Sequence, residues 1–552
     1  MEQRLLLAFA LMGLVLFVSQ YFFKPPAAPI KAVKQAQAQP AKASAPPAPA
    51  APAPVVTPAS AQSADAEQRL QIETDVYSME FSNRGAEVRK WQLKKYTTGT
   101  GKPLELVNTA AASKVHYPFA LVIKDQKVPF DVNQVLYAAT PAPDGLGVDY
   151  TYSDAHFTIR KRFRFTRSGY LSQITSEVLN GNVPVPHLIV WRGGFGDPTS
   201  INAATNQHSV YFDVSENKLI NRDAKAAKDG PVSTTGNYNF AGLHDQYFAA
   251  VFLPRDPGTQ TELQTLDDQL ANTPDGKEEP HVGAGVGGHG INNYNLFVGP
   301  KDLDLMRSID PKLEGLVDFG RWFGFIAKPL FLAVNYVNDR VTHNYGWAIV
   351  IVTIIINIAI VPLRLVSMKS MKKMAALQPE IAKINEKYKG MSIRDPKKAE
   401  QNEEMIALYK KHGVNPTSGC MPMLLPIPFF IAFYTVLTVA IEMRGARWLW
   451  IADLSQPETL AIRILPVLLI VSQFIQQKMT PQTTADPSQQ RMMMFMPLMM
   501  GFFFYGMSSG LVLYWVTGNL VGIAQQWVFN RITPAPAPAV VDVKPVGKKS
   551  RK

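Results

Sequence analysis

Long apolar runs without a single charged residue constrain this 552-residue chain most strongly, because about 20 such residues cross the ~30 Å hydrocarbon core of a bilayer. The runs cover residues 5–23, 345–363, 420–441, 464–477, 492–507 and 511–529. Ser508, Ser509 and Gly510 form a short polar break between the last two runs, which is typical of a tight helical hairpin. The sequence therefore predicts six membrane spans.

Composition excludes several protein classes. Charged residues make up 18% of the chain, below the ~25% of an average soluble domain, so a wholly soluble enzyme is excluded. Cys420 is the only cysteine, which excludes a secreted protein held together by disulfides. The net charge of +12 is compatible with nucleic acid or an anionic surface, and the position of the charges decides between them.

Lysine and arginine gather in two regions that flank the apolar runs. They are Arg364, Lys369, Lys372, Lys373, Lys383, Lys387, Lys389, Arg394, Lys397, Lys398, Lys410 and Lys411, and then Arg531, Lys544, Lys548, Lys549, Arg551 and Lys552. Such clusters mark cytoplasmic segments, so both termini are expected in the cytoplasm and the region between spans one and two outside it. The first run ends at Lys24 and Pro25 without a small-residue cleavage site, which favours an anchor over a cleaved signal peptide.

The region between the first two spans has two textures. Residues 25–60 are nearly all Ala, Pro, Lys and Gln, which predicts an extended tether without a core. From about Arg69 to Leu305, strand-like alternation recurs, and Phe157–Phe165 is expected to place aromatic residues on one face and cations on the other. We expect one large antiparallel β-sandwich on the exported side. Its basic face is either simply solvated or in contact with anionic lipid.

Two amphipathic segments border the apolar runs. Residues 311–335 carry apolar residues at helical spacing, which predicts a helix that lies in the membrane interface or packs on the β-domain. Residues 368–415 predict a cytoplasmic hairpin of two helices, about 366–389 and 397–412, separated by Gly390 and Asp395-Pro396. Its methionine stripe either fills the core of the hairpin or contacts an apolar partner.

Catalytic motifs lack the context that they need. Gly506–Gly510 matches G-x-S-x-G, but it is the turn of an apolar hairpin without a following histidine. Gly283–Gly288 matches G-x-G-x-x-G, but no helix follows, so we expect a loop. The nine histidines are scattered, and a Walker A lysine motif is absent. We expect no catalytic residue, no metal and no cofactor.

Neutral polar residues inside the spans remain to be explained. Asn357, Thr435, Gln473 and Thr517 lie within apolar runs, whereas acidic residues do not occur there. Such residues either join helices by hydrogen bonds or line a hydrated cavity, and the composition leaves both open.

Several ordered motifs point to a known family. They are His343–Gly346, MAALQPEI at 374–381, ALYKKHGVNP at 407–416, QKMT at 477–480, Asp486-Pro487 with Gln489-Gln490, Phe495-Met496-Pro497, SGLVLY at 509–514 and Asn519-Leu520. With the anchor, the tether and the β-region, the chain resembles the Gram-negative bacterial members of the YidC/Oxa/Alb family of membrane protein insertases. This resemblance spans the whole chain.

The resemblance implies a polytopic α-helical membrane protein with six spans, a five-helix insertase core and a large periplasmic all-β supersandwich domain. The expected parts are an anchor (1–24), tether (25–60), β-domain (61–310), interfacial helix (311–341), span two (342–366), cytoplasmic hairpin (367–418), span three (419–441), periplasmic loop (442–460), span four (461–479), cytoplasmic loop (480–491), spans five and six (492–530) and basic tail (531–552).

The resemblance also implies a hydrophilic groove, closed on the periplasmic side, and a slide for client segments. The residues at these positions are Asn357, Arg364, Gln473 and Thr517 for the groove, Thr435, Tyr514 and Trp515 for the slide, and Met371, Met374, Lys387 and Lys410 for the cytoplasmic hairpin. Relatives carry a groove arginine where this chain has Asn357. Arg364 lies seven residues further on, or about 10 Å along a helix, so its long side chain could reach the groove mouth.

The implied function is insertion and folding of inner-membrane proteins without nucleotide hydrolysis. Implied partners are nascent membrane proteins, the ribosome through the cytoplasmic loops and basic tail, the Sec translocon and anionic lipid, but not DNA. A solute transporter is the alternative, and it requires inverted repeats with broken helices, of which the sequence shows none. A hydrolase within the membrane requires a nucleophile with a base, and the sequence offers no convincing pair.

Overall fold

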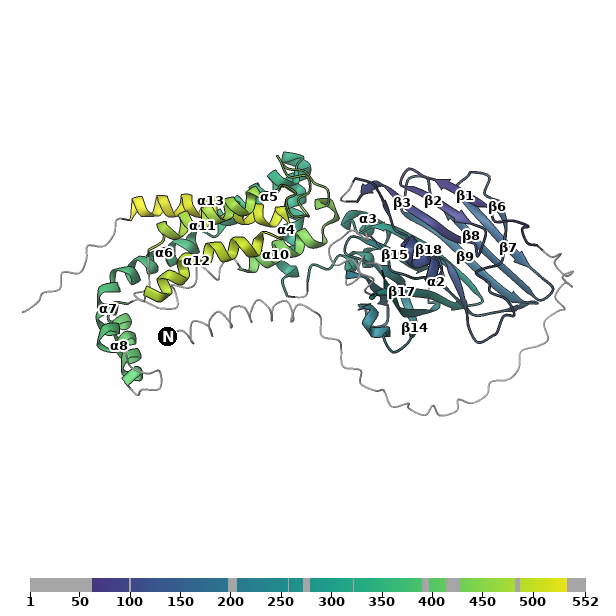
Figure 1. Cartoon of the computed structure of the whole chain (residues 1–552), viewed down its shortest axis with the longest axis horizontal. Helices are drawn as coiled ribbons and strands as arrows, with labels where there is room; N and C mark the ends of the chain where they lie inside the picture. The colour runs from purple at the N-terminus through teal and green to yellow at the C-terminus, as the bar shows by residue number, and fades with distance from the viewer. Residues whose placement is uncertain are drawn as a thin grey trace, which may run out of the picture. The chain divides into compact units, whose positions relative to one another are not determined.

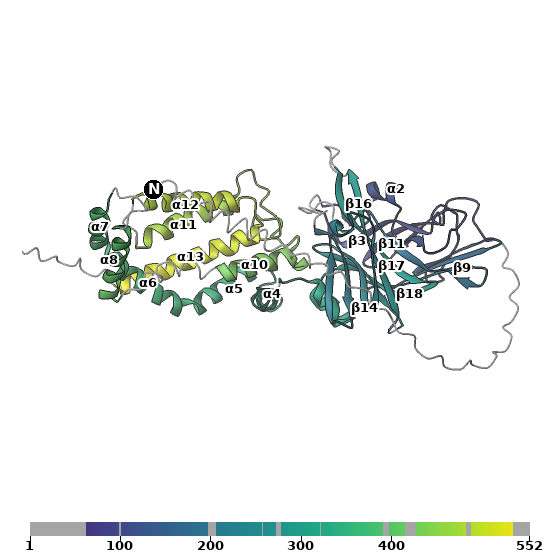
Figure 2. The same cartoon turned by 90° about the horizontal axis from the view of Figure 1, so that it is seen from below.

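The computed structural model describes residues 62–98, 101–196, 206–256, 258–271, 278–320, 322–389, 397–413, 427–481 and 487–533. They form a β-domain followed by a set of helices (Figure 1, Figure 2). The expected anchor and tether, Gly390 to Pro396, Cys420 and nearly all of the basic tail lie outside these residues.

The β-domain is antiparallel throughout its recorded strand pairs, in two sheets of four and fourteen strands. The small sheet consists of β1 (Arg69–Glu73), β2 (Tyr77–Ser82), β3 (Glu87–Thr97) and β4 (Pro103–Glu105). The large sheet consists of β5 (Ala120–Ile123), β6 (Ala138–Pro141), β7 (Gly147–Ser153), β8 (Phe157–Phe165), β9 (Leu171–Asn180), β10 (Val183–Pro184), β11 (His187–Trp191), β12 (His208–Asp213), β13 (Lys218–Arg222), β14 (Val232–His244), β15 (Phe248–Pro254), β16 (Gln260–Ala271), β17 (Glu278–His289) and β18 (Ile291–Pro300). The predicted antiparallel all-β domain is confirmed.

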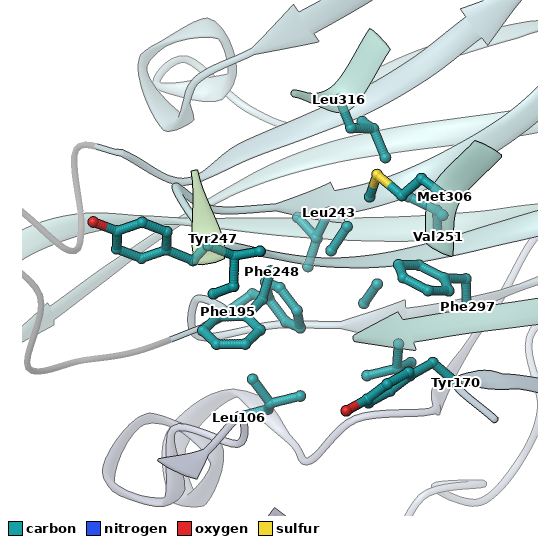
Figure 3. Close-up of a cluster of buried hydrophobic side chains, with 14 of the residues drawn as sticks. Leu106, Tyr170, Phe195, Leu243, Tyr247, Phe248, Val251, Phe297, Met306 and Leu316 are labelled. Atoms are coloured by element: carbon teal, nitrogen blue, oxygen red, sulfur yellow. The ribbon is translucent and has the colours of Figure 1, made fainter. Parts of the chain in front are cut away.

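Alternating apolar residues of these strands form the core of the β-domain. Figure 3 shows Leu243 of β14, Val251 of β15 and Phe297 of β18 close to Met306, and all four side chains are almost fully buried. Met306 belongs to α3 (Leu303–Ile309), which starts at Asp302 because this carboxylate accepts a hydrogen bond from the Leu305 amide. Two short helices also cover the sheets, α2 (Thr109–Val115) and the 3-10 helix η2 (Ala224–Ala227).

The expected separation of aromatic and basic residues on β8 is wrong at one position. Lys161 lies on the aromatic face and is 2% exposed, and its Nζ donates to the carbonyls of Gly85 (2.6 Å) and Phe119 (2.7 Å). Burial lowers the pKa of Lys161. On the opposite face, Arg160 pairs with Glu177 at 2.8 Å across the strand pair. The neighbouring Arg162 and Arg164 both pair with Asp149, so acidic partners neutralise much of the predicted basic face.

The glycine-rich motif at 283–288 is part of β17 and not a loop. Its glycines let the neighbouring strand β11 approach, since a Cβ on Gly285 would lie 3.0 Å from Val190 Cγ1 and one on Gly287 would lie 2.5 Å from the His187 carbonyl oxygen. The motif therefore serves strand packing.

The helices after the β-domain are η3 (Pro311–Leu316), α4 (Gly324–Val337), the π-helical turn η4 (Asn338–Thr342), α5 (Tyr345–Ala359), α6 (Val361–Ala376), α7 (Gln378–Lys387), α8 (Lys397–Lys411), α10 (Ile427–Val439), η6 (Ile441–Met443), α11 (Ile464–Met479), α12 (Pro487–Phe504) and α13 (Ser509–Ile532). Asn344 starts α5, because its side-chain oxygen accepts from the Gly346 amide at 3.0 Å. Pro362 and Pro379 stand in the first turns of α6 and α7, where proline is tolerated.

The continuous helix expected over residues 311–335 is interrupted. Residues Pro311–Leu316 form only a 3-10 turn, and Leu313 and Leu316 are buried in the core of the β-domain. Gly320 has a φ of +82°, and α4 begins only at Gly324. The helical periodicity of residues 311–335 therefore predicted one helix where the structure has two separate elements, η3 and α4.

Length and composition identify one candidate membrane segment among the described helices. The stretches Gly324–Thr342 and Tyr345–Ala359 meet at 117° and qualify together, whereas no single described helix qualifies by itself. Ile427–Val439, Ile464–Met479 and Met492–Phe504 are shorter apolar helices.

Candidate functional site

Helix α13 packs against both α5 and α11, the three helices run in the same direction, and their buried faces change from apolar to polar along their length. Near their N-termini, the buried side chains are Ala348, Ile349 and Val352 on α5, Leu465 and Leu469 on α11, and Leu511, Val512 and Leu513 on α13. Polar residues then appear at Thr353 and Asn357 on α5, at Ser472 on α11 and at Thr517 on α13, about 12–18 Å along the helices. One half of this bundle is therefore apolar, and the other half contains a polar interior.

A guanidinium and two amides form the centre of the polar half. Arg364 Nη1 donates to Gln525 Oε1 at 2.6 Å and, more weakly, to Asn357 Oδ1 at 3.5 Å. Gln525 Nε2 donates to the Asn357 carbonyl oxygen at 3.1 Å, and Asn357 Nδ2 donates to the Thr353 carbonyl oxygen at 2.8 Å. All three side chains are half-buried. We call Asn357, Arg364 and Gln525 the groove cluster.

Gly522 has no side chain that would occupy the position of the Arg364 guanidinium. A Cβ on Gly522 of α13 would lie 3.3 Å from Arg364 Nη1 and 2.7 Å from Gln476 Nε2 of α11. Gly522 therefore lets side chains from three helices meet at one level. Arg364 reaches this level from α6, two turns beyond Asn357, because its stem extends back along the helix.

The positive charge of Arg364 has no carboxylate beside it on these helices. The sequences of α5, α6, α11 and α13 contain neither Asp nor Glu. Its recorded partners are neutral amide oxygens, which form weaker hydrogen bonds to a cation than a carboxylate does. The cluster can therefore receive a polar or acidic group in exchange for an amide.

A second polar contact joins α11 and α13 at the border of the two halves. Asn519 Nδ2 donates to Ser472 Oγ at 3.0 Å, and both side chains are buried. Asn530 Nδ2 donates to the Met479 carbonyl oxygen at 3.3 Å, further toward the end of both helices. These bonds serve helix association, the first of the two roles considered for polar residues in the spans.

The structure unites only two of the four proposed groove residues. Asn357 and Arg364 share the groove cluster, whereas Gln473 is half-buried and Thr517 is buried, and no described hydrogen bond joins either side chain to the cluster. Sequence reasoning did not select Gln525 or Gly522. Gln525 was one of several polar residues in the last apolar run, and only the spatial position of Arg364 distinguishes it.

Aromatic residues of α10, α12 and α13 form a separate cluster. Tyr514 stacks on Phe433 with ring centroids 4.2 Å apart, and Trp515 contacts Phe430 at 4.9 Å and Phe504 at 5.0 Å. Trp515 is half-buried, while Tyr514 is 8% exposed. The third expected slide residue, Thr435, lies half-buried on α10 and donates its hydroxyl to the Ile431 carbonyl oxygen at 2.9 Å.

The expected hairpin residues have different environments. Met371 is buried with Met368 and Phe529, and Met374 is buried in a cluster with residues of α7 and α8. Lys387 pairs with Glu404 across the hairpin, and this contact raises the pKa of Lys387. Lys410 is exposed. The two methionines thus fill the cores of two helix contacts.

The motifs considered show no pair of a nucleophile and a base among the described residues. Ser508, the serine of the G-x-S-x-G match, is half-buried at the N-terminus of α13, and no described hydrogen bond joins its side chain to a histidine. In the β-domain, Ser176 Oγ lies 2.7 Å from His187 Nε2, but both side chains are buried and Asn292 Nδ2 lies 3.0 Å from the same nitrogen. Within the described ranges, no group of three or more His, Cys, Asp or Glu residues could hold a metal ion.

Comparisons with known proteins cover nearly the whole chain. Residues 69–333 match the family described as YidC periplasmic domain, and residues 337–536 match the family described as 60Kd inner membrane protein. A membrane protein insertase YidC from Geotalea daltonii is 32% identical over 97% of this chain and 100% of its own length. The Syntrophus aciditrophicus protein of the same name is 30% identical over 96% and 100%.

A solved structure described as an active YidC insertase with the first transmembrane domain resolved is also similar. It is 20% identical to this chain and covers 85% of it and 94% of its own chain, with a TM-score of 0.35.

Proposed function

This chain belongs to the YidC family of membrane protein insertases, and from that premise we propose how it inserts and helps to fold its clients. The polar half of the bundle is a groove, open to the cytoplasm, that receives the polar end of a nascent membrane protein. The observation that supports this proposal best is the groove cluster, in which Arg364 is held by amides on helices without acidic residues.

The proposed topology has six spans with both termini in the cytoplasm and residues 61–310 in the periplasm. It rests on the lysines and arginines near the hairpin and in the basic tail. In this orientation, the N-terminal ends of α5, α11 and α13 face the periplasm. The groove cluster then lies nearer to the cytoplasmic face.

The driving force comes from the client. A charge at the centre of a bilayer costs roughly 2.5–3.5 kcal/mol on insertion scales, so a polar groove that reaches into the membrane shortens the apolar path. The client's apolar segment then enters lipid and gains on the order of 25 cal/mol per Å² of surface removed from water. We propose no nucleotide hydrolysis, cofactor or enzymatic activity.

The aromatic cluster is proposed as the slide along which the client segment leaves. Trp515 and Phe430 are only partly buried, and large flat side chains offer apolar contact at a low cost in rotamer entropy. Tyr514 supports this surface through its stack on Phe433, and Thr435 lies on the same helix as Phe433.

The cytoplasmic hairpin of α7 and α8 is proposed to meet clients with its polar surface, since Met374 of α6 and Met405 of α8 belong to the apolar cluster inside it. Lys387 and Lys410 lie on that surface. The second cytoplasmic loop and the basic tail are proposed ribosome contacts, and the Sec translocon and anionic lipid are further proposed partners. Helix α4 is proposed to lie in the membrane interface, because Phe325 and Tyr336 are 76% and 66% exposed.

Insertion into liposomes without ATP tests the groove. The assay uses the full chain and a single-span client with an acidic N-terminal tail. Arg364→Gln removes the charge but keeps hydrogen bonding, and we expect insertion to fall about tenfold, as for a lost charge-assisted contact. Arg531→Gln is the matched control, because Arg531 lies on α13 against Trp527. Equal activity of both variants and the unmodified chain refutes the role of Arg364.

The alternative of a solute transporter is not supported by the relatives, which are named insertases over nearly the whole chain.

A further inference from the structure

The segment between α10 and α11 crosses the N-terminal ends of three helices, and we call residues 444–463 the cap loop. Its backbone is tightly fixed, because Trp448 and Ile451 exchange two backbone hydrogen bonds of 3.0 and 2.7 Å. Leu449 has a φ of +47° in this turn, and the Leu454 amide donates to the Ala446 carbonyl oxygen at 2.9 Å.

Glu458 holds the first turn of α11. Its carboxylate accepts hydrogen bonds from the Ile464 amide and from the Leu465 amide at 2.9 Å, and Trp450 Nε1 donates to it at 3.3 Å. Glu458 is 6% exposed. The first amides of a helix have no partner within the helix, and the helix dipole favours an anion there, so the loop and α11 are joined by a buried charged contact.

Backbone carbonyls of the same loop hold the first turn of α13. The Gln456 carbonyl oxygen accepts from the Ser509 amide and hydroxyl, both at 2.8 Å, and the Leu454 carbonyl oxygen accepts from the Gly510 amide at 2.8 Å. A Cβ on Gly510 would lie 2.9 Å from Leu437 Cδ2 and 3.1 Å from the Leu454 oxygen, so glycine leaves room for this contact.

The start of α5 completes the set. Asn344 Nδ2 donates to the Arg447 carbonyl oxygen at 2.9 Å. Gly346 packs directly under Trp448, since a Cβ there would lie 2.2 Å from the indole ring. The indole also meets Trp347 edge to face at 5.5 Å. The N-termini of helices α5, α11 and α13 are therefore all bonded to or packed against the cap loop.

An apolar layer lies directly beneath the cap loop. Ile349, Leu454, Leu465 and Leu511 come from α5, the loop, α11 and α13, and each is 0–1% exposed. All four belong to the same buried cluster. Beneath this layer, buried or half-buried polar side chains of the groove half are found at Asn357, Ser472 and Thr517, about 12–18 Å along the three helices. The cap loop and this layer thus separate the groove cluster from the N-terminal end of the bundle.

We propose that Glu458 is a positioning residue that keeps the cap loop locked over the helix ends, so that the groove excludes ions at this end while a client leaves sideways. This inference rests on the proposed groove and names the residue that closes it. Without the carboxylate, the first turn of α11 loses its cap and the loop can lift from the apolar layer. Loss of a helix cap changes an opening equilibrium by about tenfold.

The test measures ion leakage through liposomes that contain the full chain, with a pH-sensitive dye inside and an imposed potassium gradient. We expect Glu458→Ala to raise proton leakage about tenfold. Glu458→Gln keeps one oxygen acceptor, so its proton leakage is expected to lie between that of the unmodified chain and that of Glu458→Ala. Asp453→Asn is the matched control, because Asp453 accepts hydrogen bonds from Ser455 within the loop. Melting temperature and size-exclusion profile show whether each variant is folded.

A second variant acts on the same loop without touching Glu458. Gly346→Ala displaces Trp448, and we expect leakage here also, so the proposal is testable even where Glu458→Ala does not fold. Folded variants that leave the liposomes as tight as the unmodified chain overturn the proposal, even if their melting temperatures fall. Insertion by Arg364→Gln is scored separately. If the Glu458 variants do not leak but Arg364→Gln impairs insertion, only the proposed closure is overturned. If the Glu458 variants leak but Arg364→Gln inserts clients normally, only the proposed groove is overturned.

Discussion

The hydrogen bond between Arg364 and Gln525 provides the sharpest quantitative test of the groove cluster. The change is a double-mutant cycle with Arg364→Met, Gln525→Met and the combined variant, in which methionine preserves much of each side chain's length. Gln525 also donates to the Asn357 carbonyl oxygen at 3.1 Å. That bond is lost in both variants that lack Gln525, so it cancels in the cycle and leaves the coupling of the two side chains.

The expected coupling follows from the geometry and the surroundings. A hydrogen bond with one charged partner contributes about 1.5–3 kcal/mol in proteins. Side-chain hydrogen bonds between membrane helices average only ~0.6 kcal/mol, with a maximum of ~1.7 kcal/mol. The 2.6 Å distance favours the upper part of the membrane range, but both side chains are only half-buried, in what we propose is a hydrated groove. We therefore expect a coupling of about 1 kcal/mol, or a fivefold change in the unfolding equilibrium.

The assay follows unfolding of the full chain by tryptophan fluorescence during an SDS titration in mixed micelles. Asn519→Ala, combined with Arg364→Met, is a control pair, because Asn519 bonds to Ser472 and not to Arg364. This control should be additive within about 0.3–0.5 kcal/mol. A coupling between Arg364 and Gln525 inside that range would refute the groove cluster as a bonded unit.

Three further predictions concern other parts of the chain. Burial lowers the pKa of His187 from 6.5 to about 4. Protonation of His187 therefore favours the unfolded chain, and the free energy of unfolding should fall by ~3 kcal/mol from this group as the pH falls from 6.5 to 4. The His187→Gln variant should lose correspondingly less stability in the same pH titration. Gly242→Ala should destabilise the β-domain by at least 1–3 kcal/mol, because its Cβ would lie 2.2 Å from the Ala250 carbonyl oxygen, whereas Gly315→Ala meets only Leu219 at 3.6 Å and should be nearly neutral in thermal unfolding. Trp515→Ala should reduce crosslinking of a nascent client to α13, and an unchanged crosslinking yield would contradict the proposed slide.

The β-domain could be predicted from local alternation, but its exceptions could not. In Phe157–Phe165, a period of two places Lys161 on the aromatic face, and the prediction that all cations share the other face overlooked this. Burial of a lysine costs free energy unless its ammonium group is hydrogen-bonded. The carbonyls of Gly85 and Phe119 that accept from Lys161 come from distant parts of the chain. Local sequence contains no sign of them.

The groove cluster could be predicted only in part for the same reason. The family resemblance directed attention to Asn357 and Arg364, and the seven-residue spacing indicated that a long side chain could connect them. Gln525 lies 161 residues beyond Arg364, among other polar residues of α13, and only the packing of the helices selects it. Sequence reasoning did not select Glu458 within the expected periplasmic loop, because its amide partners are defined only once α11 begins at Ile464.

Solvent accessibility along α5 and α13 decides whether a hydrated groove reaches the groove cluster. Single cysteines replace Ile349, Asn357, Leu511 or Gln525 in a chain that carries Cys420→Ser, and a membrane-impermeant maleimide is added from the cytoplasmic side of inverted vesicles. We predict fast labelling at positions 357 and 525 and protection at positions 349 and 511. Protection of position 357 in a folded, active chain would contradict it, because no hydrated groove would then reach the groove cluster.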